Sequence, residues 1–260
     1  MALFRLTVRW LYCLYAIILF VVLMLLVVPF VVAGSFFGKI KGGNFIYRVC
    51  CLWGDVWFFL IGIRHRNLYE APLDRSRQFI FVANHISYLD APVIVKTLRQ
   101  PVRVLGKVEM ARVPVFGFIY RNAIVTVDRS SAENRAKSVR ILKSVIRKGI
   151  SIFIFPEGTF NETHLPVKEF YDGAFRIAIE TQTPIKPVLF LDAYERMHYR
   201  SVFSLNPGRS RSVFLEEIPV AGYTPKDVKQ LRDLVHSIME KKLLEYKAAW
   251  IMQDNPADKR

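Results

Sequence analysis

The sequence predicts an α/β fold, a mixed sheet flanked by helices, with an N-terminal hydrophobic membrane-anchoring helix or two-helix motif. Short apolar runs alternate with helical patterns across residues 67–260, which is typical of α/β domains. Ahead of them, residues 10–33 contain no charged side chain. We therefore divide the chain into a membrane anchor, residues 1–66, and a catalytic domain, residues 67–260.

The uncharged segment 10–33 is long enough to cross a membrane. As a helix it would extend about 36 Å, and a hydrocarbon core is about 30 Å thick. A cleaved signal peptide is the alternative, because Arg5 and Arg9 form a basic start and residues 31–33 weakly resemble a cleavage site. The apolar run is much longer than the roughly 7 to 15 residues of such peptides. We therefore predict a retained anchor.

A second apolar stretch, residues 45–63, holds Arg48 and Asp55 as its charged residues. The basic residues around the two stretches do not settle their orientation. Either the first stretch is a single span, or the two stretches form a two-helix anchor. In the second case the later helix returns to the same side or lies in the interface, with Arg64 and Arg66 at headgroup level. We favour the two-helix anchor.

Strands of the catalytic domain are predicted from short apolar runs bounded by loop residues. They cover residues 78–83, 102–106, 123–127, 151–155, 185–191 and 212–216. A helix is expected over 131–148, because Ser130 and Glu133 form a capping box and Gly149 follows the last turn. Thr224 opens a last helix with an apolar stripe that we expect in the core. The stripe comprises Val228, Leu231, Leu234, Val235, Ile238 and Met239. Residues 196–212 are expected to form a mobile, basic loop.

The composition combines a net charge of +15 and a pI of about 9.9 with 52% hydrophobic residues. This favours a folded protein that meets an anionic surface, either nucleic acid or membrane. The cysteines Cys13, Cys50 and Cys51 lack the spacing of a disulfide framework or a zinc site and fit a reducing compartment.

Three short stretches follow predicted strands, where α/β sheets tend to assemble their sites. They are NHISYLD at 84–90, TVDRS at 126–130 and FPEGT at 155–159. Taken singly each has a structural explanation, since His85 resembles an ordinary histidine at a strand end and Asp90 suits a helix N-cap. Together they supply a base, a cation and a carboxylate at strand ends.

This combination favours transfer of a group onto a hydroxyl. Histidine accepts a proton near neutral pH and a carboxylate fixes its tautomer, so His85 is the candidate base and Asp90 its orienting partner. Arg129 and Lys107 offer cations to a phosphate, and Glu157 suits acceptor hydroxyls. The sequence has no GxSxG elbow and no cysteine in the catalytic domain, which argues against a covalent serine or thiol enzyme.

These motifs resemble those of a known family. NHISYLD is similar to its NHxSxxD block, FPEGT to its FPEGTxS block, and residues 183–188, TPIKPV, to its PIxPV block. The family is that of the 1-acyl-sn-glycerol-3-phosphate acyltransferases, also called lysophosphatidic acid acyltransferases or PlsC-like proteins. Order and spacing match over roughly residues 80–190.

The resemblance implies transfer of a fatty acyl group from acyl-CoA or acyl-ACP to the sn-2 hydroxyl of lysophosphatidic acid, giving phosphatidic acid in phospholipid biosynthesis. It implies that His85 is the general base and that Asp90 orients it. The residues that it implies for substrate binding are Asn84, Ser87, Lys107, Arg129, Glu157, Gly158 and Thr159. It also implies no metal or other cofactor, and a location at the cell inner membrane with the catalytic domain facing the cytoplasm.

The chain departs from the family pattern at two places. Phe160 and Asn161 stand where the family usually has Arg-Ser, and Asn122 stands where the second block usually begins with Gly. Loss of that Arg removes one possible hydrogen-bond donor to the phosphate of the acceptor. Either another cation replaces it, from among Lys107, Arg129, Lys168 and Arg176, or the acceptor is another lysolipid, such as an acylated amino acid.

Two alternatives come from other classes. A lipid hydrolase would use the same histidine with water as the acceptor. A membrane-tethered module that binds anionic lipid or nucleic acid would use the basic charge without needing His85. The sequence shows no nucleic-acid motif and no aromatic residues interleaved with basic ones, so we predict no nucleic-acid partner.

Overall fold

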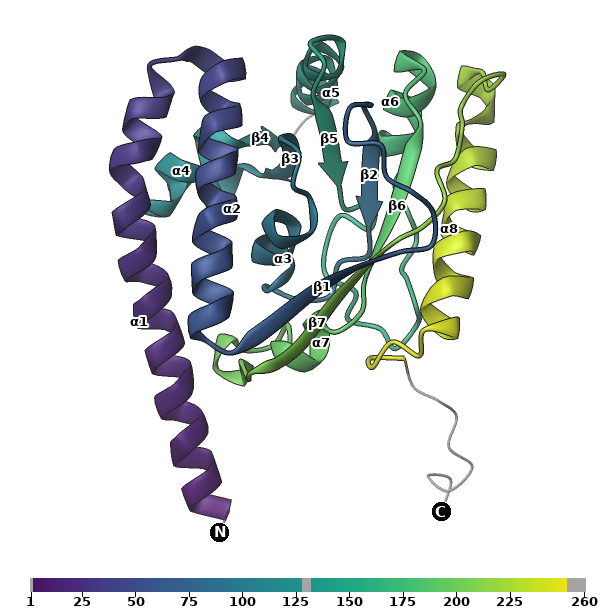
Figure 1. The fold of residues 1–260 in the computed structure, drawn as a ribbon. Helices are drawn as coiled ribbons and strands as arrows, with labels where there is room; N and C mark the ends of the chain where they lie inside the picture. The colour runs from purple at the N-terminus through teal and green to yellow at the C-terminus, as the bar shows by residue number, and fades with distance from the viewer. Residues whose placement is uncertain (1, 128–131, 252–260) are drawn as a thin grey trace, which may run out of the picture.

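The computed structural model describes residues 2–127 and 132–251. Within them, seven strands form one sheet in the order β1-β7-β6-β2-β5-β3-β4 (Figure 1). The strands are β1 (Ile63–Tyr69), β2 (Ile80–Ala83), β3 (Val102–Lys107), β4 (Ile124–Val127), β5 (Ser151–Ile154), β6 (Ile185–Phe190) and β7 (Gly208–Phe214). From β6 to β4 neighbouring strands are parallel, whereas β7 runs antiparallel to β6 and pairs in parallel with β1. The predicted mixed α/β sheet is confirmed.

Helices cover both faces of this sheet. The α-helices are α1 (Ala2–Ser35), α2 (Gly43–Leu60), α3 (Asp90–Thr97), α4 (Phe116–Ala123), α5 (Ala132–Arg147), α6 (Gly173–Thr181), α7 (Ala193–Arg196) and α8 (Val228–Glu245). Short 3-10 turns cover Val108–Arg112, Val202–Ser204 and Pro225–Asp227, and a π-helical turn covers Gly38–Gly42.

The central strands are buried on both faces, which explains their nearly continuous apolar sequence. In β2, Ile80 and Val82 pack with α5, α6 and α8, while Phe81 and Ala83 pack on the opposite face with α2 and α3. Because the strands from β6 to β4 are parallel, their carboxyl ends meet at one edge of the sheet. The loops after β2, β5 and β6 therefore lie together.

The helices α1 and α2 form a hairpin beside the sheet (Figure 1). Trp57 of α2 donates its indole N–H to the carbonyl of Ala16 at 3.0 Å, and Tyr12 donates its hydroxyl to the carbonyl of Ile61 at 2.7 Å. Asp55 of α2 pairs with Lys96 and with Arg99, at 2.6 Å for the arginine, so α2 is also fixed to the body. A two-helix N-terminal motif is therefore present.

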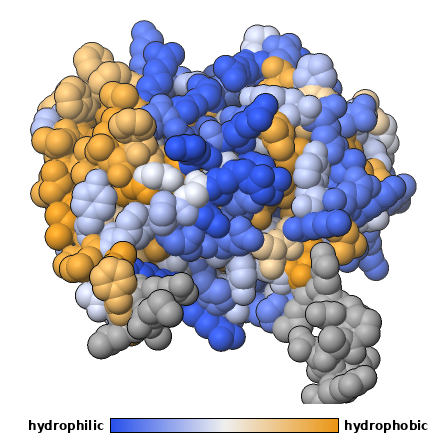
Figure 2. All heavy atoms as spheres, turned by 60° about the horizontal axis from the view of Figure 1, so that its bottom comes forward, coloured by the Kyte–Doolittle hydropathy of each residue, from blue (hydrophilic) through white to orange (hydrophobic). Residues whose placement is uncertain are grey.

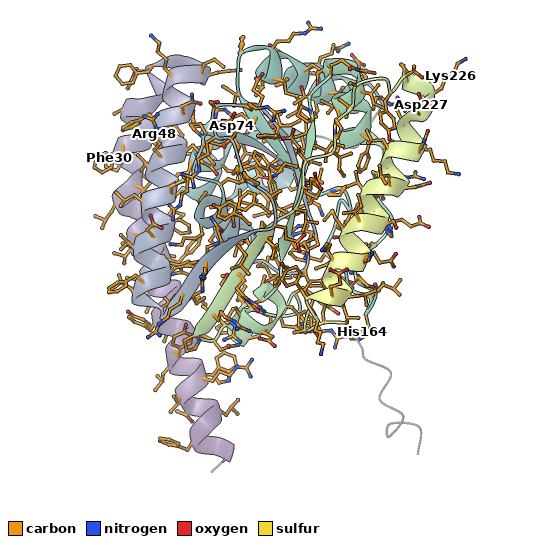
Figure 3. All side chains as sticks on the ribbon, turned by 45° about the vertical axis from the view of Figure 1, so that its right-hand side comes forward. Phe30, Arg48, Asp74, His164, Lys226 and Asp227 are labelled. Atoms are coloured by element: carbon orange, nitrogen blue, oxygen red, sulfur yellow. The ribbon has the colours of Figure 1, made fainter. Side chains whose placement is uncertain are left out.

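Apolar side chains cover the outside of this hairpin. Within the described residues, one helix, Leu6–Ser35, is long and apolar enough to cross a membrane. Phe30 projects from α1 away from the body and is 55% exposed (Figure 3). From the underside, apolar residues gather over the hairpin while hydrophilic residues spread over the middle of the molecule (Figure 2).

The observed strands differ from the predicted ones at β1 and β7. β1 crosses the predicted domain boundary at residue 66, so Arg64 and Arg66 lie in an edge strand that pairs with β7. Apolar periodicity missed this strand because residues 64–67 form an unbroken run of polar side chains with no apolar alternation. The strand predicted at 212–216 is β7, which begins at Gly208, so the end of the predicted loop 196–212 is ordered sheet.

The helix boundaries agree more closely. α5 spans Ala132–Arg147 and Gly149 follows it with φ of 83°, as expected for a helix end, while Ser130 lies outside the described residues. Thr224 opens the last helix as predicted, and it forms a capping box with Asp227 ahead of α8. The stripe of α8 packs into the core, except that Leu234 is 41% exposed.

Candidate active site

His85 lies in the loop just after β2, and its ring is fixed from several sides. Its Nδ1 lies 2.8 Å from Oδ2 of Asp90. The rings of His85 and Phe155 stack with centroids 3.9 Å apart, and Phe160 meets His85 edge-on at 4.5 Å. The His85 side chain remains 22% exposed, so the ring is held in place and still reaches the surface.

Asp90 is fully buried and binds the loop that carries His85. Its Oδ2 accepts the main-chain N–H groups of Ile86 at 2.7 Å and Ser87 at 2.9 Å, in addition to the His85 contact. It is the first residue of α3 and makes no capping bond to that helix. The N-cap interpretation of Asp90 is therefore wrong, because its carboxylate is directed back toward the preceding loop.

The Asp90 contact sets the tautomer of His85. A carboxylate accepts hydrogen bonds, so Nδ1 carries the proton and Nε2 presents its lone pair. Nε2 has no hydrogen-bond partner among the described residues. The pair thus provides an oriented base whose free nitrogen is available to a hydroxyl.

Glu157 connects the two loops of the site. Its Oε1 accepts the main-chain N–H of His85 at 2.8 Å, and its Oε2 accepts that of Lys168 at 3.0 Å. The side chain is 1% exposed, and this burial raises the pKa of Glu157 to about 8, although the two N–H donors oppose the shift. A second link runs from the N–H of Asn161 to the carbonyl of His85, at 2.7 Å.

Comparison with known proteins places this geometry in a family. The model of the acyltransferase family matches residues 63–191, from the start of β1 to just beyond β6. The chain belongs to this acyltransferase family. Its matched region contains the oriented base and both loops that hold it.

Individual relatives agree with that assignment. The chain is 28% identical to the 1-acyl-sn-glycerol-3-phosphate acyltransferase of Haemophilus influenzae over 201 residues, 74% of this chain and 80% of that protein. It is 28% identical to human 1-acyl-sn-glycerol-3-phosphate acyltransferase beta, over 70% of this chain and 68% of that protein. The crystal structure of PlsC, the 1-acyl-sn-glycerophosphate acyltransferase of Thermotoga maritima, superposes with a TM-score of 0.72 at 23% identity. That superposition covers 96% of this chain and 99% of that one, and it shows a common fold.

Two residues expected to bind substrate have buried, structural positions in this acyltransferase. The amide of Asn84 donates to the carbonyl of Phe190 at 3.0 Å and accepts the N–H of Phe190 at 2.8 Å. The hydroxyl of Ser87 donates to the carbonyl of Met197 and accepts the N–H of Leu89 at 3.0 Å. With exposures of 1% and 0%, neither side chain reaches the surface in this structure, and the substrate-binding role expected for them stays a prediction.

The hydrogen bonds of Glu157 are also internal, and its expected contact with acceptor hydroxyls stays a prediction. Both of its oxygens are directed to main-chain N–H groups inside the acyltransferase, so in this structure it positions the loops. Gly158 turns the chain next to it with φ of 72°, a left-handed conformation that favours glycine. Thr159 is exposed, and its hydroxyl accepts a hydrogen bond from Nζ of Lys168 at 2.9 Å.

The cations expected to bind phosphate are spread over the acyltransferase. Lys107 is exposed at the carboxyl end of β3, and Arg176 is exposed on α6. Arg129 lies outside the described residues. Lys168, among the members of this set that the structure describes, contacts the FPEGT loop through Thr159 and also donates to the carbonyl of Phe160 at 3.3 Å.

The aromatic surroundings of His85 were not predicted from sequence. Besides Phe155 and Phe160, Tyr88 meets the Phe160 ring edge-on at 4.8 Å and is itself 51% exposed. Phe155 is the first residue of the FPEGT motif and Phe160 follows the motif directly, so the motif could have pointed to both. Their contact with the His85 ring depends on bringing two loops together, which no local pattern reveals.

Proposed function

We propose that this acyltransferase moves a fatty acyl group from acyl-CoA or acyl-ACP to the sn-2 hydroxyl of lysophosphatidic acid, giving phosphatidic acid. The observation that carries the proposal is the 2.8 Å contact between His85 Nδ1 and Asp90, which leaves Nε2 free to accept a proton. The activities named for the relatives from Haemophilus influenzae and human support the choice of substrate.

The chemistry follows from the oriented base. Nε2 of His85 accepts the proton of the acceptor hydroxyl as its oxygen attacks the thioester carbonyl. The new C–O bond gives a tetrahedral oxyanion, and its collapse breaks the C–S bond. The departing thiolate receives the proton from the imidazolium, which the buried carboxylate of Asp90 stabilises while it exists. The reaction as proposed uses no metal or other cofactor.

The surroundings of His85 support a second acceptor class. Phe160 and Tyr88 make the wall beside the imidazole aromatic rather than cationic. Against such a wall, a neutral or less phosphorylated lysolipid, including an acylated amino acid, would have fewer headgroup charges left without a partner. With lysophosphatidic acid as the acceptor, Lys168 is the nearest candidate for its phosphate, because its ammonium group already contacts Thr159 and the carbonyl of Phe160.

The apolar hairpin supports a location at a membrane. We propose the cell inner membrane, with the catalytic domain facing the cytoplasm, because acyl-CoA and acyl-ACP are cytoplasmic donors. The apolar exposed face of α1 supports contact with the bilayer.

One assay tests the proposed reaction. The full chain in detergent is incubated with acyl-CoA or acyl-ACP and a panel of lysolipids, and acylated lipid and free fatty acid are both measured. We expect phosphatidic acid from lysophosphatidic acid. Free fatty acid as the main product would identify a hydrolase, and absence of turnover with every donor would contradict an enzymatic role.

A further inference from the structure

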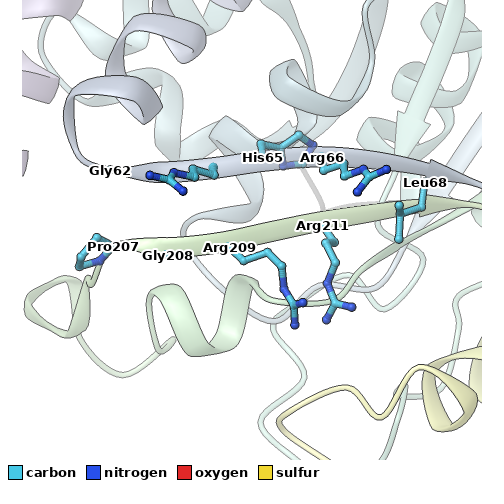
Figure 4. Close-up of a pocket in the computed structure, with 9 residues that line it drawn as sticks. Gly62, His65, Arg66, Leu68, Pro207, Gly208, Arg209 and Arg211 are labelled. Carbon is cyan, nitrogen blue, oxygen red and sulfur yellow. The ribbon is translucent and has the colours of Figure 1, made fainter.

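Four arginines lie on one face of the strand pair β1–β7. The parallel register places Arg64 beside Arg209 and Arg66 beside Arg211. Residues two apart in a strand project to the same side, and neighbouring strands are about 4.8 Å apart, so the four side chains form a compact grid. Figure 4 labels Arg66, Arg209 and Arg211 along the two strands, and Arg64 lines the same pocket. We call this grid of four arginines the arginine ribbon.

On the opposite face of the same strands, the polar side chains form hydrogen bonds with other groups of the protein. His65 contacts Ser210 at 2.9 Å and Asn67 at 2.9 Å, and the hydroxyls of Thr97 and Ser212 lie 2.7 Å apart. Burial lowers the pKa of His65 to about 4, so this inner face is neutral. The positive charge of the strand pair is therefore concentrated on the outer face.

Most of that charge is not neutralised by the protein. Arg211 binds Asp192 through two hydrogen bonds, at 2.9 and 2.8 Å. Arg64, Arg66 and Arg209 are exposed and have no side-chain hydrogen bond or ion pair within the described part of the chain. Like charges placed directly opposite each other on a sheet repel and destabilise it. An external anion would remove that repulsion.

The arginine ribbon begins where the apolar hairpin ends. Gly62 lies two residues after the end of α2, and its carbonyl accepts the N–H of Gly208 at 3.1 Å, which joins the starts of β1 and β7. The hydroxyl of Tyr15 on α1 donates to the carbonyl of Leu60 at 3.2 Å, and Phe59 is 81% exposed beside it.

The segment leading into β7 is held by α1 as well. The rings of Trp10 and Phe203 lie 4.5 Å apart, and Arg9 donates to the carbonyl of Ser204 at 3.3 Å. Exposed tryptophan and tyrosine side chains next to an apolar surface are typical of the level at which a protein meets lipid headgroups. The ribbon and the apolar surface are therefore continuous.

The shape of the ribbon favours several separate phosphates. It lines an open pocket of about 770 Å³ whose other walls include Gly62, Pro207 and Leu68. Guanidinium groups bind phosphate through paired N–H donors, and a row of them matches the headgroups of a lipid surface. We propose that the arginine ribbon binds the headgroups of anionic phospholipids and so orients the catalytic domain on the bilayer.

This site is separate from the acyl-acceptor site and does not depend on which lysolipid is acylated. The apolar hairpin supplies one line of contact with the bilayer, and the ribbon supplies a second beside it. Two lines of contact restrict rotation of the body about α1, which a single helix would not do.

Lipid enrichment tests the proposal. The full chain is equilibrated in nonionic detergent with phosphatidylcholine and phosphatidylglycerol at about 10:1, repurified, and the copurified lipids are quantified. We expect the unmodified protein to enrich phosphatidylglycerol about 10-fold over the bulk ratio, and less as salt is added. The triple variant R64Q/R66Q/R209Q should approach the bulk ratio.

A matched control removes the same charge elsewhere. Lys137, Arg140 and Arg147 are exposed on α5, at the opposite end of the molecule from the ribbon's start (Figure 1). K137Q/R140Q/R147Q should retain the enrichment. Absence of enrichment in the unmodified protein, or equal loss in both triple variants, would overturn the proposal. The pair variants R64Q/R209Q and R66Q/R209Q replace the triple variant if its thermal stability is reduced.

A kinetic arm distinguishes lipid from the acyl donor. In micelles without anionic lipid, the KM values for acyl-CoA and acyl-ACP should be the same for the ribbon variant and the unmodified protein. A raised KM for either donor, with lipid enrichment intact, would assign the ribbon to CoA phosphates or to the acidic carrier protein and overturn the proposal. Lipid enrichment is measured without catalysis, so its outcome does not depend on the proposed function.

Discussion

Glu157 accepts the main-chain N–H of His85 at 2.8 Å, although the two residues are 72 positions apart in the sequence. The loop after β5 thereby fixes the loop after β2. The imidazole is held through its backbone by Glu157 and through its ring by Asp90, so the position of the base depends on two buried carboxyl groups.

Removing the charge of Asp90 tests the catalytic pair. Asp90→Asn should lower kcat by about 100-fold to 10,000-fold, because an amide neither fixes the His85 tautomer nor stabilises the imidazolium. His85→Ala should cause a loss of similar size, and the double variant should lose little more, because the two residues act as a unit. Initial rates of acyl transfer provide the measurement.

His164 offers a control for general effects of removing a histidine. It is exposed near the foot of α8 (Figure 3), where its Nδ1 lies 3.1 Å from the carbonyl of Trp250. His164→Ala should keep most of the activity. Full activity in folded His85→Ala protein would be incompatible with the proposed base.

The raised pKa of Glu157 predicts a pH-dependent contribution to stability. In the folded protein the carboxyl has a pKa of about 8, against an ordinary value of 4.5, so the unfolded chain loses this proton first as the pH rises. The contribution of Glu157 is thus fully present below pH 4.5 and is lost as the pH rises through about 8. Glu157→Gln cannot titrate and should remove this dependence.

Urea unfolding at several values between about pH 5 and pH 8 measures the effect. The free energy of unfolding of the unmodified protein should fall with rising pH relative to that of Glu157→Gln. The variant should also lose activity, because an amide nitrogen cannot accept the second main-chain N–H. Parallel pH profiles for the two proteins would show that Glu157 is ionised in the folded state throughout.

Phe160 is predicted to influence which lysolipid is accepted. An arginine there would offer a phosphate up to two charge-assisted hydrogen bonds, so Phe160→Arg should raise the preference for lysophosphatidic acid over monoacylglycerol by about 10-fold to 100-fold. Phe160→Leu removes the ring without adding charge and should leave the preference nearly unchanged. The ratio of kcat/KM values for the two acceptors is the readout, and equal ratios in both variants would exclude Phe160 from acceptor recognition.

Asn84 is predicted to stabilise the folded protein. Asn84→Ala leaves both the N–H and the carbonyl of Phe190 without their side-chain partner in a buried position. The free energy of unfolding should fall by about 2 to 4 kcal/mol, as expected for two buried unpaired groups. Thermal and urea unfolding measure the loss. A change below about 0.5 kcal/mol, typical of surface substitutions, would show that the two hydrogen bonds to Phe190 contribute little to stability.

Elements with a strong local signal could be predicted closely from the sequence. The strand at 102–106 and the helix ahead of Gly149 lie within a residue of their observed bounds, because apolar runs and helix ends are encoded by neighbouring residues. β1 could not be found in this way. Its arginines and histidine show no apolar alternation, and it becomes a strand by pairing with β7, about 145 residues later in the chain.

The fold class, the apolar N-terminal helix and the choice of His85 and Asp90 as candidate catalytic residues could be inferred without a structure, since each depends on residues close together in the chain. The surroundings of Asn84, Ser87 and Glu157 follow only from the three-dimensional fold, because burial and hydrogen-bond partners depend on loops from distant strands meeting at one edge of the sheet. It also brought Phe155 and Phe160 against the His85 ring, and it aligned arginines from β1 and β7 on one surface. These relationships arise from strand order and register, which no single stretch of sequence encodes.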